Sequence, residues 1–339
     1  MRASNVLCFA SIAVRPGGSV ATPELIQLQR RRPEASHLPK RVRLPADDPP
    51  RPEWMKVRMH MGSEFQDVSY LMRGLSLHTI CEEAHCPNIY ECWEQRTATF
   101  LVLGRVCTRA CRFCAVETGV PDDVDADEPE RLAEAVAALR LRHAVVTSVA
   151  RDDLPDGGAH IFARTIRAIR EKAPDCAIEV LVPDFQGSEE AVRAVSDVRP
   201  DVFNHNVETV ERLQRRVRAK AFYTRSLWVL QRAKELGSGV TTKSGMMLGV
   251  GERPPEVVQT MRDLRAVGCE VLTIGQYLRP LATNLPVERY VTPEEFAQYR
   301  EEGLAMGFKH VEAGPLVRSS YHARDHVEQV RTAPTLVHE

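Results

Sequence analysis

The chain has 339 residues, of which 43% are hydrophobic and 27% are charged, and its formal net charge is −1. This composition is normal for a soluble globular protein, and the balanced charge gives no overall field that favours nucleic acid or a membrane surface as partner. No apolar run approaches the roughly 20 residues that span a bilayer. Nine cysteines, an odd number clustered at short spacing, do not form the pattern of a secreted disulfide framework and favour a reducing compartment.

Residues 1–50 differ from the rest of the chain. The first 46 carry eight Lys or Arg against two acids, and prolines and glycines interrupt any regular element. Three interpretations stay open: a disordered basic arm or a start codon placed too early, an Arg-rich organellar presequence, and a secretory signal at 6–14, which the thin flanking charge disfavours. We exclude this arm from the predicted fold.

Further along, apolar strands alternate with amphipathic helices. The strands are near-continuous apolar runs, as in a sheet that is buried on both faces. Ser188 is a predicted N-cap, Gly237 is expected in the left-handed C′ position, and Pro293 takes the favoured first position of a helix. The predicted strands are 99–104, 144–149, 177–182, 201–204, 240–248 and 270–276, and the predicted helices are 128–140, 159–172, 188–197, 224–236, 254–267 and 292–306.

Six strand–helix alternations predict a parallel sheet with right-handed crossovers. Six are too few for a closed eight-stranded barrel, so the predicted fold class is α/β, an open, partial (β/α)6 TIM-like barrel. In such folds the chemistry lies at the C-terminal ends of the strands. The predicted domains are an N-terminal extension at 51–98, the barrel at 99–310 and a C-terminal tail at 311–339.

Three cysteines follow the first predicted barrel strand, in the pattern Cys107-x3-Cys111-x2-Cys114. Three thiolates are one short of what a [4Fe–4S] cluster or a closed zinc site requires. An iron without a protein ligand can bind a small molecule, so the triplet suggests a reactive cluster. A zinc knuckle with a distant fourth ligand is the alternative, but zinc pairs are more often spaced C-x2-C and no fourth ligand at matching spacing is present.

With aromatic Phe113 before its last cysteine, this motif resembles that of the radical S-adenosylmethionine (SAM) superfamily. The resemblance implies a [4Fe–4S] cluster whose fourth iron chelates SAM, and whose electron cleaves SAM to a 5′-deoxyadenosyl radical. Gly245, Met247, Gly249 and Glu252 match the superfamily's G-x-I-x-G-x-x-E pattern, with Met in place of Ile. Glycine at a strand end also lets the backbone approach a ligand closely. These four residues are therefore candidate SAM-binding positions.

Other polar residues lie at predicted strand ends. Asn204, His205 and Asn206 are polar residues at the position where ribose hydroxyls would lie, and of these His205 is expected to be structural. Lys243 faces the active-site side of its strand and could contact a carboxylate or be a charge on the rim. Gln276 and Tyr277 end the sixth strand and could present backbone to the adenine.

A second cysteine triplet, Cys81-x4-Cys86-x5-Cys92, precedes the barrel, and the sequence RSSY occupies positions 318–321. Together these resemble one family within the superfamily, the lipoyl synthases. The resemblance extends from about Pro52 to His322, and includes TSVARDDLPDGG at 147–158, TKSGMMLGVGE at 242–252 and QYLRP at 276–280.

The resemblance implies that Cys81, Cys86, Cys92 and Ser320 hold an auxiliary [4Fe–4S] cluster, with Ser319 as the neighbouring candidate ligand. SAM-derived radicals would abstract hydrogen from carbons six and eight of an octanoyl chain, and each carbon would take a sulfur from the auxiliary cluster. Unactivated C–H bonds offer no acidic proton to a general base, so a cofactor radical is needed. No catalytic residue beyond the cluster ligands is predicted.

The octanoyl chain would be amide-linked to a lysine of a lipoyl carrier domain of a 2-oxoacid dehydrogenase or of glycine-cleavage H protein. An electron donor such as ferredoxin or flavodoxin and cluster-assembly proteins are the other expected partners, without nucleic acid or membrane. A cytoplasmic location is expected, with a mitochondrion or plastid as the alternative if the arm is a presequence.

Three rival functions remain to be weighed. A transfer-RNA methylthiotransferase also carries two triplets, but with an N-terminal domain and a basic RNA-binding module that are not seen here. Biotin synthase would place its auxiliary ligands inside the barrel. A non-enzymatic iron–sulfur or zinc protein would not need the SAM-contacting strand ends. Cys8, Cys176 and Cys269 have no partner spacing and are predicted to be unligated.

Overall fold

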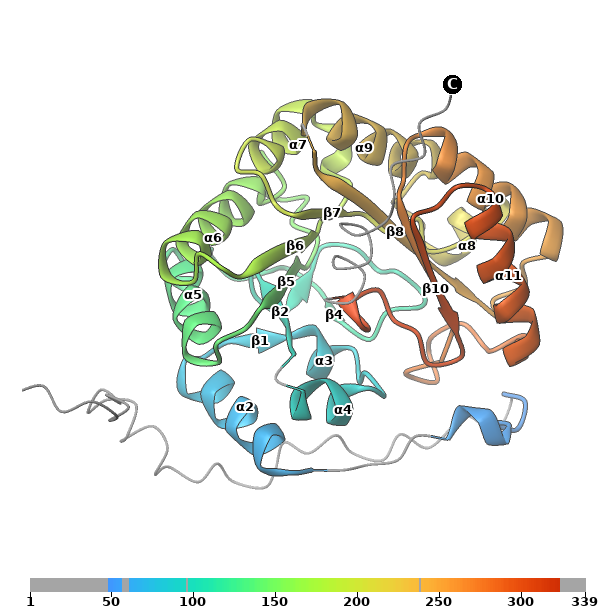
Figure 1. The fold of residues 1–339 in the computed structure, drawn as a ribbon, viewed down its shortest axis with the longest axis horizontal. Coiled ribbons are helices and arrows are strands. Elements are labelled where there is room, and N and C mark those ends of the chain that lie inside the picture. Colours follow the sequence, from blue (N-terminus) through green and yellow to red (C-terminus); the bar gives the residue numbers. More distant parts are fainter. Residues whose placement is uncertain (1–47, 57–60, 96, 238, 324–339) are drawn as a thin grey trace, which may run out of the picture.

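The computed structural model describes residues 48–56, 61–95, 97–237 and 239–323, and within them one large sheet dominates the fold (Figure 1). The sheet has eight strands in the order β1-β2-β5-β6-β7-β8-β9-β10. Every neighbouring pair is parallel except β1 and β2. The strands are β1 (His78–Thr79), β2 (Thr99–Val102), β5 (His143–Ser148), β6 (Ala177–Leu181), β7 (Val202–Asn204), β8 (Thr241–Leu248), β9 (Val271–Gln276) and β10 (His310–Gly314).

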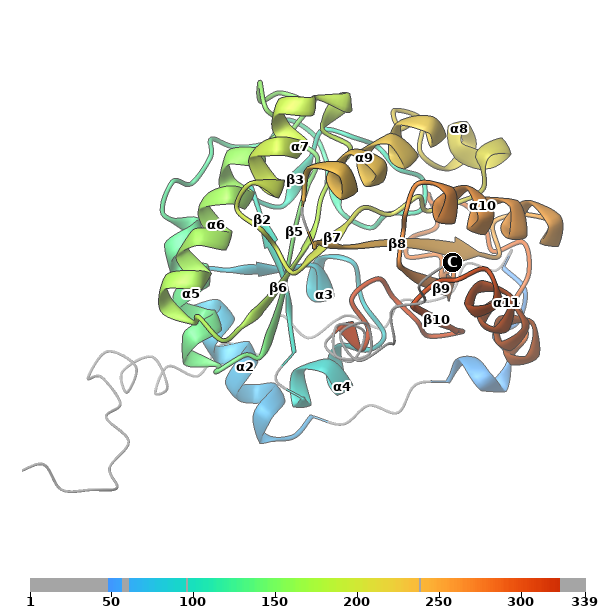
Figure 2. The same cartoon turned by 45° about the horizontal axis from the view of Figure 1, so that its top comes forward.

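In the described segments, six helices follow the barrel strands. Figures 1 and 2 show these helices in an arc around the outer face of the sheet. Each follows one strand from β2 to β9, so the predicted six strand–helix units and the open barrel are confirmed. Strand and helix bounds agree with the prediction to within two residues. The helices are α5 (Glu128–Ala138), α6 (Ala159–Lys172), α7 (Glu189–Ser196), α9 (Tyr223–Leu236), α10 (Pro254–Ala266) and α11 (Pro293–Ala305).

Two details of the prediction are wrong. The sheet does not end with the sixth strand, because β10 pairs in parallel with β9 from His310 to Gly314. The segment expected as a tail from residue 311 therefore begins inside the barrel sheet. Gly237 caps α9 with a φ of −93°, and the left-handed backbone falls instead on Gly239, with a φ of +81°.

The predicted side-chain cap at Ser188 and the predicted first-turn proline at Pro293 are confirmed. Ser188 accepts a hydrogen bond from the Ala191 N–H at the start of α7. Thr292 and Glu295 form a reciprocal capping box at the start of α11, with Pro293 in the first turn. These side chains satisfy backbone donors that a helix start leaves unpaired.

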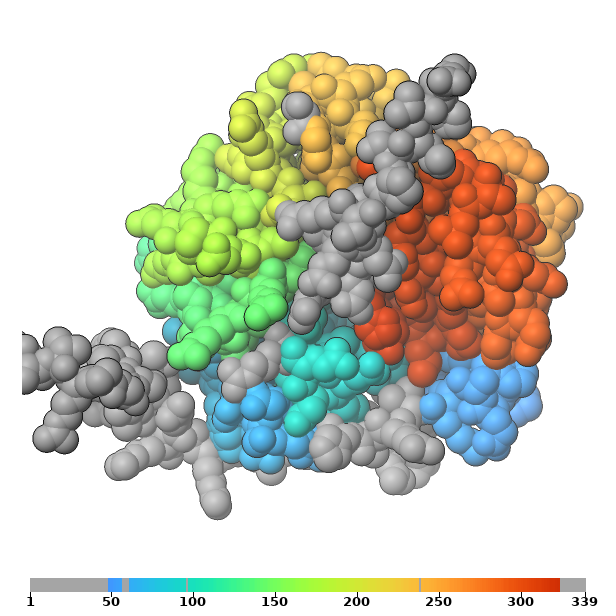
Figure 3. Space-filling model, in the orientation of Figure 1, coloured from blue at the N-terminus to red at the C-terminus, as the bar shows by residue number. Residues whose placement is uncertain are grey.

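The N-terminal extension lies along the lower edge of the barrel in the view of Figure 3, with its teal residues between the green and red parts and its blue residues below these parts. It contains η2 (Glu53–Met55), α2 (Ser63–Gly74), α3 (Ile80–Glu83) and α4 (Ile89–Glu94). The Phe65 ring of α2 packs against the Trp93 ring of α4 in a tilted arrangement, with 5.1 Å between the ring centroids. Asp48 accepts hydrogen bonds from Arg279 (3.2 Å) and from the Val287 N–H (3.1 Å), so the first described residues are also held on the barrel.

Buried apolar side chains fill the space between the sheet and its helices. None of the helices in the described segments has the length and apolar content that crossing a bilayer requires. Residues 1–47, and with them most of the expected basic arm and Cys8, lie outside the described residues.

Candidate active site

One cavity of about 1970 Å³ opens between the barrel and the N-terminal extension. This exceeds the roughly 300–1,000 Å³ of ordinary small-molecule sites, so it has room for more than one ligand. Cys114 of the second triplet lines it, and so do Cys81 and Cys86 of the first triplet and Ser320 of the C-terminal segment. The fold thus brings residues that are far apart in the sequence to the wall of a single chamber.

The second triplet lies in the loop after β2, where Cys107 ends the short strand β3 (Val106–Cys107). The Cys107 sulfur accepts hydrogen bonds from the Arg109 N–H (3.4 Å) and the Ala150 N–H (3.3 Å). Burial raises the pKa of the Cys111 thiol, and it raises that of Cys114 to about 12. Such thiols stay neutral at pH 7 unless a cation replaces their protons, as cluster iron does.

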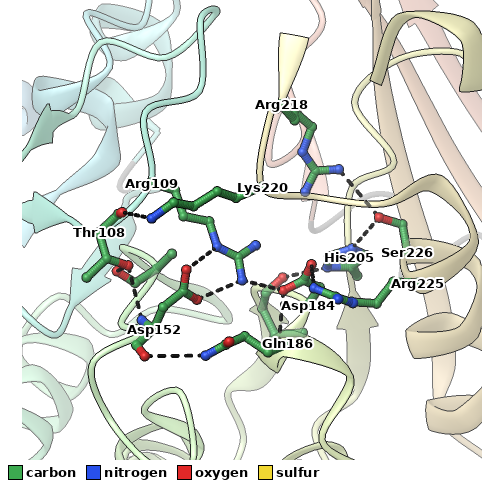
Figure 4. A network of polar contacts seen from close by, with 12 residues as sticks. Thr108, Arg109, Asp152, Asp184, Gln186, His205, Arg218, Lys220, Arg225 and Ser226 are labelled. Atoms are coloured by element: carbon green, nitrogen blue, oxygen red, sulfur yellow. Dashed lines mark hydrogen bonds and ion pairs between the residues drawn. The ribbon is translucent and has the colours of Figure 1, made fainter. Parts of the chain in front are cut away.

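A buried ion-pair network fixes this loop to the barrel (Figure 4). The Arg109 guanidinium donates two hydrogen bonds to Asp152 (2.7 and 2.8 Å) and one to Asp184 (2.6 Å). Burial alone would raise the pKa of Asp184, but Arg109 lowers it to about 2. Asp152 follows β5 and Asp184 follows β6, so the arginine between the first two cysteines ties the loop to two strand ends.

The first triplet surrounds a second, small cavity. Its wall includes Cys81, Cys86, Cys92 and Ser320. Burial raises the pKa of all three thiols, that of Cys81 to about 12. None of these cysteines is in a disulfide. Three buried free thiols and one hydroxyl around one small cavity are a donor set that fits an iron–sulfur cluster.

The two candidate serines occupy different places. The Ser320 hydroxyl accepts a hydrogen bond from the Thr99 hydroxyl at 2.8 Å, on the wall shared with the first triplet. The Ser319 hydroxyl donates to the Asn206 side-chain oxygen at 2.7 Å and accepts from Asn204 at 3.3 Å, inside the barrel. Their geometry therefore favours Ser320 as the residue that accompanies the first triplet.

Contacts on both sides of Ser320 hold the C-terminal segment against the extension. The Asn88 side-chain amide donates to the Leu316 carbonyl at 2.7 Å, and the Tyr321 hydroxyl donates to the Glu91 carboxylate at 3.0 Å. Gly275 leaves room for this path, since a Cβ there would lie 2.1 Å from the Val317 carbonyl oxygen.

The predicted SAM-binding residues divide into two groups. Gly245, Met247, Gln276 and Tyr277 line the large cavity, whereas Asn204, Lys243, Gly249 and Glu252 do not. The Glu252 carboxylate accepts hydrogen bonds from the Gly249 N–H (2.7 Å) and the Val250 N–H (3.0 Å), so it closes the loop that follows β8. Gly249 has a φ of +98°, and a Cβ there would lie 2.2 Å from the Gln276 amide nitrogen.

Lys243 is neither a rim charge nor a cavity residue. Its ammonium contacts both carboxylate oxygens of Glu179, at 2.9 and 3.1 Å, and both side chains are almost fully buried. Asn204 donates to the same carboxylate at 2.8 Å. Burial alone would raise the pKa of Glu179, but Lys243 lowers it to about 2.

His205 is structural, as its sequence context predicts. It is buried, and its ring nitrogens contact the Val182 carbonyl (2.8 Å) and the Ser226 hydroxyl (3.0 Å). Burial lowers the pKa of this imidazole to about 4, so it is neutral at pH 7.

Two more polar residues lie in the cavity wall, of which the sequence pattern marked Asn206 as a candidate and missed Glu208. Asn206 and Glu208 follow β7 and line the large cavity, and the Asn206 amide donates to the Glu208 carboxylate at 3.1 Å. Burial raises the pKa of Glu208. The signal that could have marked Glu208 is its place two residues after Asn206, in the mostly polar segment that follows β7.

Within the described segments, no three His, Cys, Asp or Glu side chains converge as a site for a single metal ion. Each cysteine of a [4Fe–4S] cluster binds a different iron, so the ligands of a cluster need not meet at one point.

Comparison with known proteins defines the class first. Residues 101–264 match the family profile of the radical SAM superfamily, and residues 26–86 match that of the N-terminal domain of lipoyl synthase of the radical SAM family. The crystal structure of HydG, a maturase of the [FeFe]-hydrogenase, has the same fold, with a TM-score of 0.50 and 13% identity over 78% of this chain and 60% of that one. The protein is therefore a radical SAM enzyme.

Curated relatives define the family. The lipoyl synthase of Rubrobacter xylanophilus is 61% identical over 83% of this chain and 88% of its own length. That of Symbiobacterium thermophilum is 57% identical over 86% of this chain and 91% of its own length. The chain belongs to the lipoyl synthase family. The second profile begins at residue 26, inside the segment that the sequence analysis set aside as an arm.

Proposed function

We propose that this enzyme inserts two sulfur atoms at carbons six and eight of an octanoyl chain that is amide-linked to a lysine of a carrier protein. One observation carries the proposal: a single cavity is lined by Cys114 on one side and by Cys81, Cys86 and Ser320 on the other. An octanoyl chain bound in this cavity would lie within reach of both cysteine triplets.

The residues fit two clusters. Cys107, Cys111 and Cys114 would hold the SAM cluster, and Cys81, Cys86, Cys92 and Ser320 would hold the auxiliary cluster, the sulfur donor. The fit rests on the placement of the donors: three free thiols and one hydroxyl border the small cavity, and Cys114 lines the large one. Each thiol gives up its proton when it binds iron. When bound, the first cluster with SAM supplies the radical chemistry that C–H cleavage needs, and the second supplies sulfur.

The chain's own residues then have defined tasks. Arg109 and its two carboxylate partners hold the second triplet at the rim of the barrel. Gly245, Met247, Asn206 and Glu208 form the nearby cavity wall on which SAM would lie.

The Ser320 oxygen accepts one hydrogen bond, from Thr99, so its second lone pair can still bind iron. An oxygen ligand binds cluster iron more weakly than thiolate, so we propose that this iron is the one released when sulfur leaves.

The proposed partners are octanoylated lipoyl carrier domains of 2-oxoacid dehydrogenases or glycine-cleavage H protein, a ferredoxin or flavodoxin as electron donor, and cluster-assembly proteins. A cytoplasmic location is proposed with them, as is the division into extension, barrel and C-terminal segment, with β10 assigned to the barrel.

Anaerobic reconstitution tests the proposal. The protein is loaded with iron and sulfide, supplied with reductant, SAM and an octanoyl-lysyl peptide, and the peptide is followed by mass spectrometry. Gain of two sulfurs with two 5′-deoxyadenosines per product is expected. Cleavage of SAM without sulfur in the peptide would contradict the substrate assignment and favour the transfer-RNA alternative.

A further inference from the structure

Arg218 lies between two loops that the proposed function requires. On one side, the Arg112 N–H donates to the Val217 carbonyl at 2.9 Å. Cys111 precedes Arg112 and Arg218 follows Val217, so this hydrogen bond brings the two backbones together next to Cys111 and Arg218. On the other side, Arg218 Nη1 donates to the carbonyl oxygens of Asn206 (3.1 Å) and Val207 (3.2 Å). The segment of Val217 and Arg218 thus joins the two loops: its backbone contacts the loop of the second triplet, and the Arg218 side chain contacts the loop after β7.

Arg218 differs from the other arginines of this network (Figure 4) in having no carboxylate partner among the residues drawn. Arg109 is balanced by two aspartates, and Arg225 lies 3.4 Å from the Asp184 carboxylate. Arg218 is only 8% exposed, and in the described part of the chain no carboxylate forms an ion pair with it. Its remaining polar contact is the neutral Ser226 hydroxyl, at 3.4 Å.

Burying a cation that no carboxylate pairs with costs free energy of folding. The positive charge of Arg218 is therefore not neutralised by an ion pair and acts on the groups around it. Those surroundings are functional. The hydrogen bond between Arg112 and Val217 holds Arg218 next to the loop that carries Cys111. The bonds to the Asn206 and Val207 carbonyls hold its guanidinium next to the segment that carries Glu208. The charge of Arg218 therefore lies beside a proposed cluster ligand and beside the cavity wall.

We propose that Arg218 is a positioning residue that anchors the Asn206–Glu208 loop beside the second triplet and supplies the positive charge that makes the cluster there easier to reduce. One-electron reduction adds negative charge to a cluster, and a nearby buried cation stabilises the reduced form. This inference rests on the proposed function, since it assumes that Cys107, Cys111 and Cys114 hold the cluster that binds SAM.

The test compares Arg218→Gln, which removes the charge, with Arg218→Lys, which keeps it. Lysine is a point donor that does not reproduce the planar fork of arginine. Arg225→Gln is the matched control, because it removes an arginine of the same network that an aspartate already balances. Each full-length protein is reconstituted, and the cluster whose electron paramagnetic resonance signal changes on addition of SAM is titrated for its midpoint potential. The dissociation constant of SAM is measured in parallel.

The midpoint potential is expected to become more negative in Arg218→Gln, and to stay at the wild-type value in Arg218→Lys and Arg225→Gln. SAM should bind about tenfold more weakly in both Arg218 variants, because the anchor to two carbonyls is lost. An unchanged potential in an Arg218→Gln protein with full iron content would overturn the proposal.

If Arg218→Gln does not load its cluster, the midpoint potential and the SAM affinity of Arg218→Lys are used instead. Wild-type potential with weakened SAM binding supports the charge as the cause, and a shifted potential overturns it. Failure of the proposed function would look different, since the wild-type protein itself would then show no cluster that responds to SAM.

Discussion

Replacing Lys243 with methionine should destabilise the fold and leave SAM binding nearly unchanged. The lysine was a candidate SAM contact in the sequence, but its ammonium lies on Glu179 inside the barrel, where both side chains are at most 1% exposed. Removing the ammonium leaves the Glu179 carboxylate in the core with the Asn204 amide as a hydrogen-bond donor. His143 lies 3.5 Å from the same carboxylate.

The magnitude follows from the protonation of Glu179. Breaking one side of a buried pair costs about 3–5 kcal/mol. The carboxyl can limit this cost by taking up a proton, which from an ordinary pKa of 4.5 costs about 3.4 kcal/mol at pH 7 and about 0.7 kcal/mol at pH 5. The destabilisation should therefore be about 3 kcal/mol at neutral pH and shrink as the pH falls.

The wild-type protein should show the opposite dependence of stability on pH at this residue. There Glu179 has its pKa lowered to about 2, so its stabilising contribution is present above about pH 4.5 and is lost as the pH falls toward 2. In Lys243→Met the pKa of the folded state is raised instead, so the loss of stability grows with pH.

Urea unfolding of the protein without clusters, at pH 5, 6, 7 and 8, measures this directly. The double variant Lys243→Met/Glu179→Gln is the control, and it should recover most of the lost free energy and lose the pH dependence. A Lys243→Met protein as stable as wild type, with SAM affinity reduced tenfold or more, would refute the reasoning and restore Lys243 as a cofactor ligand.

Other substitutions test the auxiliary site. Ser320→Ala should remove about half of the bound iron and abolish sulfur insertion while SAM cleavage persists, whereas Ser319→Ala should keep both clusters; equal iron loss in the two would contradict the assignment. Ser320→Cys should keep its iron and insert sulfur more slowly, and a wild-type rate would show that weak ligation is not the reason for serine. Gly275→Ala should displace the backbone at Val317 and destabilise the protein by about 1–3 kcal/mol with loss of auxiliary iron. Gly314→Ala, whose Cβ would lie 3.3 Å from a methyl group of Val317, is its matched control and should retain that iron.

The barrel could be predicted from the sequence because its signals are local. Apolar runs, helix periodicity and caps such as Ser188 and Thr292 lie within a few residues of the elements that they define. The strand β10 was missed because its sequence, HVEAG, is only partly buried and its pairing with β9 depends on a partner more than 30 residues away.

The site could be predicted only in part. Cysteine spacing marks both triplets, but it does not say that they face one cavity, since that depends on how the extension folds under the barrel. For Lys243 the sequence left a carboxylate contact in the site and a charge on the rim both open, because a strand position shows which face a side chain takes and not which residues it contacts. Arg218 and Glu208 carry no motif, and their importance follows from burial and from neighbours on other elements.

The most direct test of the two-sided cavity is the origin of the inserted sulfur. The auxiliary cluster is assembled with a heavy sulfur isotope, free sulfide is removed, and the octanoyl-lysyl peptide is analysed by mass spectrometry after one turnover. Both sulfurs of the product should carry the heavy isotope, and Ser320→Ala should yield SAM cleavage without labelled product. Unlabelled sulfur in the wild-type product would contradict the account, because the donor would then lie outside the site formed by Cys81, Cys86, Cys92 and Ser320.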